Sequence, residues 1–198
     1  MTVATQKRMR LEEYLTYDDG TDTRYELVDG VLVEMGAEST INTLIAGFLF
    51  EVFIRLGLPG YRIGFKQKIE VSSTYASARD PDLIIHSEES ILAIDRRPEA
   101  ILMLAEPNPS IVIEVVSPGP QSSDNYQRDY VQKPREYADR CISEYWIVDP
   151  IREWVMVGTL NDGAYAFEKF VGIQAIGSSV FPALHLTAEQ VLRAGRSV

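Results

Sequence analysis

The feature that most constrains this chain is the six-residue run 111–116 (IVIEVV), in which five β-branched side chains surround one acid, Glu114. Continuous β-branched runs are typical of strands buried on both faces. An ionised carboxylate inside such a strand is costly unless a cation, a metal ion or a proton compensates it. The run therefore predicts a central strand with an acid that needs a partner. The alternative is that Glu114 ends the strand and reaches solvent beside Ser117-Pro118-Gly119.

A second acid, Asp82, opens another short apolar strand, which is predicted over residues 82–85. Pro81 restricts how the chain enters this strand. Taken alone, the Asp80-Pro81-Asp82 sequence is better interpreted as a turn, because Asp and Pro are common turn residues. Taken with Glu114, it predicts two acids at the ends of neighbouring strands. Their oxygens are the ligands that Mg²⁺ or Mn²⁺ prefers.

Residues 24–35 (RYELVDGVLVEM) predict a β-hairpin, because two β-rich runs flank Asp29-Gly30, a strong type I′ turn signal. A two-residue turn pairs Glu26 with Val33 and places Glu26 on the face of Val28 and Val31. If that aliphatic face is buried, Glu26 is a third acid on the buried side. An ion pair between Glu26 and Arg24 is an equally good interpretation.

The remaining elements follow from apolar spacing. Helices are predicted over residues 39–55, 124–140 and 188–193, and strands over 61–71, 144–148, 153–159 and 164–171. No internal repeat or interdomain linker interrupts them. Because helices and strands mix without a regular βαβ repeat, we expect a single α+β domain over residues 1–198, with a mixed β-sheet flanked by helices.

Lys133 lies in the second of these helices, where Asp129, Lys133 and Tyr137 form one stripe at i, i+4, i+8 spacing. One interpretation is a solvated helix face with an Asp–Lys pair. The other is a lysine directed at the acids, where it orients a water molecule or offsets phosphate charge. Pro134 predicts a kink or a restart of the helix at this point.

Composition limits the partners and the compartment. No apolar run approaches the ~20 residues that span a bilayer, and the N-terminus shows no apolar segment of a secretory signal. The single cysteine, Cys141, cannot form an internal disulfide, which suits the cytoplasm. The two histidines, His86 and His185, stand apart and argue against a zinc site.

Net charge is an objection to nucleic-acid binding, because 29 acidic residues against 19 basic ones give −10. A DNA partner would need a local basic surface. The best candidate in the sequence is the outer face of the predicted strand 61–71, where Arg62, Lys66 and Lys68 alternate to one side. An ordinary solvated edge is at least as good an interpretation of these three residues.

Several motifs together resemble one known family, the Uma2 family of proposed endonucleases. They are YELVDG (25–30), PDL (81–83), IEVVSP (113–118), Lys133 with Glu136-Tyr137, and EYWIVDP (144–150). That family is placed in the PD-(D/E)XK restriction-endonuclease-like superfamily, and the resemblance covers about residues 11–192. This chain departs from the pattern at Val116, where the parent motif has lysine, and at Pro134, where the family often has arginine. Asn42 or Thr43 stands where the family tends to have histidine.

The resemblance implies hydrolysis of DNA phosphodiester bonds. Asp82 and Glu114 would be the motif acids and, with the Val115 carbonyl, would hold Mg²⁺ or Mn²⁺. Lys133 would replace the missing motif lysine, and Glu26 would complete the catalytic set. Two rival functions stay open: a catalytically inactive member of the fold that binds nucleic acid or protein, and a different hydrolase or structural oligomer on the same scaffold. The sequence does not settle whether the chain forms a homodimer.

Overall fold

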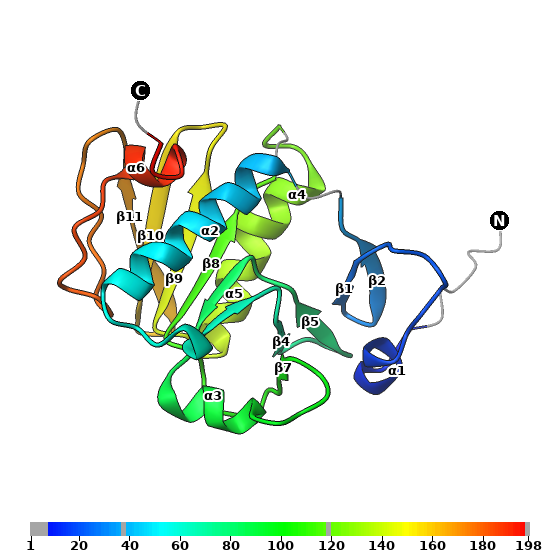
Figure 1. Cartoon of the computed structure of the whole chain (residues 1–198). Coiled ribbons are helices and arrows are strands. Elements are labelled where there is room, and N and C mark those ends of the chain that lie inside the picture. The colour runs from blue at the N-terminus through cyan, green and yellow to red at the C-terminus, as the bar shows by residue number, and fades with distance from the viewer. Residues whose placement is uncertain (1–7, 37–38, 118–119, 197–198) are drawn as a thin grey trace.

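Two mixed β-sheets form the framework of the computed structural model, which describes residues 8–36, 39–117 and 120–196 (Figure 1). The larger sheet has six strands, in spatial order β11 (Ala164–Phe170), β10 (Trp154–Asn161), β9 (Glu144–Asp149), β8 (Ile111–Val115), β6 (Leu83–Ile85) and β3 (Ile63–Phe65). The smaller sheet has five, in the order β2 (Val31–Glu34), β1 (Tyr25–Val28), β5 (Ser77–Arg79), β4 (Lys68–Val71) and β7 (Ile101–Leu102). Only β8–β9 and β4–β7 pair in parallel among these strands.

The helices are α1 (Leu11–Leu15), α2 (Thr40–Arg55), η1 (Gly60–Arg62), α3 (Glu88–Ile94), α4 (Asp124–Gln127), η2 (Arg128–Gln132), α5 (Lys133–Asp139) and α6 (Ala188–Leu192). Helix α2 crosses one face of the larger sheet, and the smaller sheet lies to the right with α1 (Figure 1). In the part of the chain that the structure describes, none of these helices combines the length and the apolar character needed to cross a lipid bilayer. The α+β prediction with helices flanking mixed sheets is confirmed.

Strand β8 separates two hydrophobic layers, as its continuous aliphatic run predicts. Ile111, Ile113 and Val115 pack with the apolar side of α2. Val112 packs on the opposite face with Tyr137 of α5. Because side chains alternate along a strand, Glu114 is directed toward α5 and not toward α2.

The hairpin has the predicted register, with Glu26 opposite Val33 and Val28 opposite Val31. Its fully buried aliphatic residue is Leu27, however, which packs against α1 on the face opposite Glu26. The valine face, which was the condition for burying Glu26, is only half-buried. Glu26 is nevertheless completely buried, because its face of the hairpin turns toward a polar cluster.

The prediction of one continuous strand over residues 61–71 is wrong. Residues 60–62 form η1, β3 ends at Phe65, and Lys66 adopts a left-handed backbone with φ 51° before the chain enters β4 in the other sheet. Arg62, Lys66 and Lys68 therefore do not share a face. The Arg62 guanidinium donates to the His86 carbonyl at 2.8 Å, and the Lys68 ammonium lies 5.8 Å from the centre of the Tyr14 ring.

The helical region 124–140 restarts before Pro134, as predicted, and does so through a π-helical turn. The Lys133 N–H donates to the Arg128 carbonyl, five residues back, at the end of η2. A wider turn is the expected response, because Pro134 has no N–H and its ring displaces the preceding carbonyls. Lys133 itself keeps helical angles, with φ −57° and ψ −43°.

The expectation about a secretory signal concerns the N-terminal residues, of which 1–7 lie outside the described residues. Pro118-Gly119, beside the alternative position of Glu114, also lie outside them.

Candidate active site

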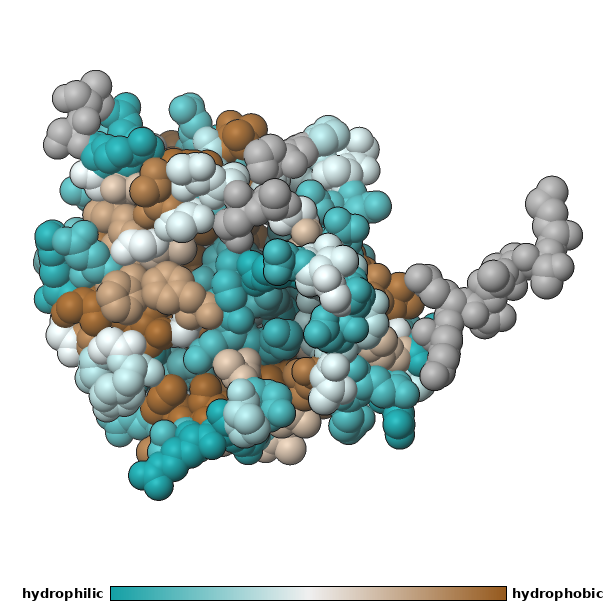
Figure 2. Space-filling model, turned by 45° about the vertical axis from the view of Figure 1, so that its right-hand side comes forward, coloured by the Kyte–Doolittle hydropathy of each residue, from teal (hydrophilic) through white to brown (hydrophobic). Residues whose placement is uncertain are grey.

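The two predicted acids lie at the same edge of the larger sheet. Strands β6 and β8 are antiparallel neighbours with Leu83 opposite Ile113, so Asp82 and Glu114 follow at adjoining positions. The Asp82 carboxylate accepts a hydrogen bond from the Val115 N–H at 2.6 Å. Both acids line a pocket of about 240 Å³. Figure 2 shows a hollow bordered by hydrophilic residues on this side of the molecule.

Lys133 enters the pocket from the helix and contacts three carboxylates. Its Nζ lies 2.9 Å from Glu114, 3.2 Å from Asp129 and 3.5 Å from Glu26. The Tyr137 hydroxyl donates to the other Glu114 oxygen at 3.0 Å. The stripe of Asp129, Lys133 and Tyr137 therefore points inward and is buried, and the interpretation as a solvated face is wrong.

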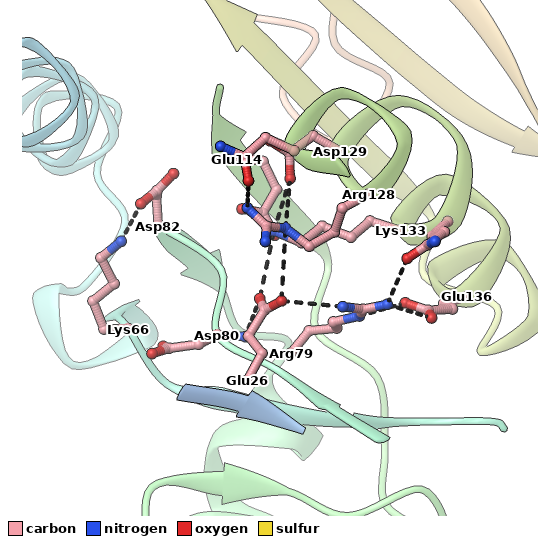
Figure 3. Close-up of polar contacts among 12 residues, drawn as sticks. Glu26, Lys66, Arg79, Asp80, Asp82, Glu114, Arg128, Asp129, Lys133 and Glu136 are labelled. Atoms are coloured by element: carbon pink, nitrogen blue, oxygen red, sulfur yellow. Dashed lines mark hydrogen bonds and ion pairs between the residues drawn. The ribbon is translucent and has the colours of Figure 1, made fainter. Parts of the chain in front are cut away.

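Glu26 belongs to the same cluster, although its main partner is a residue that sequence analysis missed. The buried Arg79 guanidinium lies 3.0 Å from Glu26 and also donates two hydrogen bonds of 2.6 Å to Glu136 (Figure 3). Arg24, the partner considered for Glu26, pairs with Asp80 instead. No signal in the Ser77-Ala78-Arg79 sequence indicates that this arginine is buried.

Burial and charge shift the ionisation of the cluster in opposite directions. Burial raises the pKa of Glu114 to about 8; the Lys133 ammonium opposes this, and nearby Asp82 and Asp129 add to it. Burial also disfavours the charged form of Glu26, but Lys133 and Arg79 outweigh it and lower the pKa to about 2. Burial likewise works against the Lys133 ammonium, but Glu114 and the other acids raise its pKa above the usual range. Lys133 is therefore protonated, and Glu114 is the carboxyl of the cluster that most readily keeps a proton.

The donors around Glu114 fit a hard divalent cation by their chemistry. Among residues 8–36, 39–117 and 120–196, no group of three or more His, Cys, Asp or Glu side chains is arranged to hold a metal ion. Two carboxylates, Asp82 and Glu114, and the Val115 carbonyl nevertheless form the kind of oxygen set with which Mg²⁺ retains several waters. Asn42 donates to that carbonyl at 2.9 Å, which leaves the second lone pair of the oxygen available.

In this mixed sheet, an aspartate at the start of one strand lies beside a glutamate on the neighbouring strand, and a lysine approaches both from a helix. This arrangement is that of a restriction-endonuclease-like protein. The chain belongs to the Uma2 family, described as "Putative restriction endonuclease", whose profile matches residues 11–189. A solved structure with the same fold is titled as a putative nuclease belonging to DUF820 from Anabaena variabilis. It is 16% identical, with a TM-score of 0.69 over 95% of this chain and 99% of that one. A comparison with curated proteins gave no match.

Proposed function

We propose that this chain is a metal-dependent endonuclease that hydrolyses phosphodiester bonds in DNA. The observation that carries the proposal is the convergence of Asp82, Glu114 and Lys133 on one polar pocket at adjoining strand positions. Restriction-endonuclease-like families generally use divalent metal ions, which agrees with the oxygen donors of this pocket.

In the proposed mechanism, Asp82, Glu114 and the Val115 carbonyl would hold one or two Mg²⁺ or Mn²⁺ ions. A bound ion would supply a water of lowered pKa and would offset charge on the scissile phosphate. Lys133 favours the ionised form of Glu114 and adds positive charge to the pocket wall. Glu26 acts through Lys133 by fixing the position of its ammonium.

DNA must reach a protein that repels it at long range, since the net charge is −10. The face expected from Arg62, Lys66 and Lys68 does not exist as one surface. Positive side chains instead lie at the pocket itself, where Arg24, Lys66 and Arg128 contribute to the lining. We therefore place the contact with the DNA backbone around the pocket mouth.

The test is cleavage of plasmid and single-stranded DNA with Mg²⁺ or Mn²⁺, with and without a chelator. We expect Asp82→Asn and Glu114→Gln each to lower the rate roughly a hundredfold or more, because altering even the outer-shell partners of metal ligands costs about 10–100-fold. Glu51→Gln is the matched control, because Glu51 pairs with Arg55 on the exposed side of α2, away from the pocket lining. Cleavage that survives both site substitutions, or that needs no metal, would contradict the proposal.

A catalytically inactive, binding member of the fold is the second candidate. The observation that favours it is that both acids already have cations of the chain as partners, Lys66 for Asp82 and Lys133 for Glu114. Calorimetry with Mn²⁺ tests this candidate, because the absence of binding heat would favour an inactive member whose acids stay paired with lysines. Light scattering on the same samples determines whether the chain forms a homodimer.

A further inference from the structure

We propose that Lys66 is a second lysine of the active site, which leaves Asp82 when a divalent cation binds there and then contacts the substrate phosphate. The inference rests on the proposed function and deepens it. Lys66 and Lys133 approach the acids from opposite sides, as Figure 3 shows. The pocket thus holds two ammonium groups in different settings.

The two lysines differ in how tightly they are held. The Lys133 side chain is 2% exposed and lies among three carboxylates. The Lys66 side chain is 30% exposed, lines the pocket and forms an ion pair with one oxygen of Asp82. Moving Lys133 would leave buried acids uncompensated, whereas moving Lys66 exposes Asp82 to the pocket. Lys66 is therefore the ammonium that can change partners during a reaction.

The two oxygens of Asp82 have separate roles in this arrangement. Oδ2 accepts from the Val115 N–H, which fixes the orientation of the carboxylate. Oδ1 faces Lys66 and is the oxygen that a metal ion would take. Because an ammonium and a divalent cation compete for this oxygen, metal binding displaces Lys66. A lysine on a flexible stem then has an anion within reach, the phosphodiester that approaches the metal.

The backbone around Lys66 is built to hold the lysine at this position. Lys66 has a φ of 51°, which is rare for residues other than Gly, Asn and Asp. Such a backbone conformation persists only where the surrounding structure imposes it. The next residue, Gln67, is bound to the buried His86 ring at 2.6 Å, and His86 is bound to Ser90 at 3.0 Å. This chain of hydrogen bonds secures the segment where the polypeptide passes from one sheet to the other.

The experiment compares Mn²⁺ affinity with the cleavage rate in the full chain. Lys66→Asn removes the ammonium and suits the left-handed backbone, since Asn tolerates positive φ. Lys66→Gly is the second variant for the same reason. Lys68→Gln is the matched control: Lys68 is two residues away, lies over the Tyr14 ring and is not among the residues that line the pocket. Thermal unfolding of each variant verifies that the fold is retained.

We expect Lys66→Asn to bind Mn²⁺ about tenfold more tightly in calorimetry, because a positive charge that repels the cation and competes for Asp82 is gone. At saturating Mn²⁺ its kcat should fall roughly a hundredfold, as when one charge-stabilising donor is removed. Lys66→Arg should recover part of kcat, and Lys68→Gln should match the unmodified protein in both measurements.

Unchanged or weaker Mn²⁺ binding by both Lys66→Asn and Lys66→Gly would overturn the exchange at Asp82. An unchanged kcat would overturn the contact with phosphate. If the unmodified chain bound Mn²⁺ but cleaved no DNA, the proposed endonuclease function would fail. Tighter binding by Lys66→Asn would in that case still support the exchange, so the two failures are distinguishable.

Discussion

Replacing Lys133 with Met tests the electrostatic organisation of the pocket most directly. Lys133 is the only cation within 3.5 Å of Glu114 among the described ion pairs, and it also contacts Asp129 and Glu26. Breaking a buried ion pair from one side costs about 3–5 kcal/mol, because the remaining charge is left uncompensated. Part of this cost is avoided at Glu114, because its pKa, raised to about 8, already favours the protonated carboxyl at pH 7. Glu26 retains Arg79. We therefore expect a loss of about 3–4 kcal/mol in the free energy of unfolding at pH 7.

Urea unfolding followed by tryptophan fluorescence measures this loss, because Trp146 is completely buried. Arg55→Met is the matched control. Arg55, like Lys133, is a helical residue that pairs with a glutamate, but the Arg55 and Glu51 side chains are 73% and 55% exposed. Such exposed pairs contribute only about 0.3–0.5 kcal/mol. Adding Glu114→Gln to Lys133→Met should recover part of the lost stability, because one uncompensated carboxyl disappears. A Lys133→Met protein no less stable than Arg55→Met would refute the charge argument.

Two further predictions concern the hydrogen bonds of His86 with Gln67 and Ser90. Burial, with a smaller effect of Arg62, lowers the pKa of His86 to about 4 from 6.5. As pH falls, this histidine is therefore protonated in the unfolded chain before it is protonated in the folded chain. The free energy of unfolding should decrease as pH drops from 6.5 toward 4, by about 2 kcal/mol at pH 5. Urea titrations should show a smaller decrease for His86→Gln. In Gly64→Ala, the new Cβ would lie 1.9 Å from the Gln67 oxygen that binds His86. Loss of that bond should cost about 1–3 kcal/mol in thermal or urea unfolding, and nothing further in a Gln67→Ala background.

Elements with strong local signals could be predicted from the sequence. Asp29-Gly30 determines the hairpin register, since both residues adopt positive φ, 48° and 81°. Ser39 caps α2 by accepting from the Asn42 N–H at 3.2 Å, at the position where the apolar period begins. The aliphatic run around Glu114 required a buried strand with a compensated acid. In each case a few adjacent residues carry the physical cause.

The missed features depend on contacts between distant segments. In residues 61–71, Ile63 and Phe65 occupy positions of the same parity as Ile69 and Val71, so alternation continues across the break and gives no sign of it. The break occurs because the two halves pair with strands of different sheets. Arg79 was missed because its burial depends on Glu26 and Glu136, which lie 53 and 57 residues away.

The charges around the pocket connect the proposed metal and the proposed DNA substrate. The ion pairs in and behind the pocket join six carboxylates and five basic side chains: Glu26, Asp80, Asp82, Glu114, Asp129 and Glu136 with Arg24, Lys66, Arg79, Arg128 and Lys133. With Glu114 protonated, as its raised pKa favours, the other five carboxylates balance the five basic side chains. A divalent cation that displaces this proton leaves one net positive charge, which a phosphodiester can then neutralise. Without the cation, the pocket has no net positive charge to offset the repulsion between DNA and a protein of net charge −10. The proposed reaction therefore requires metal binding before productive DNA binding.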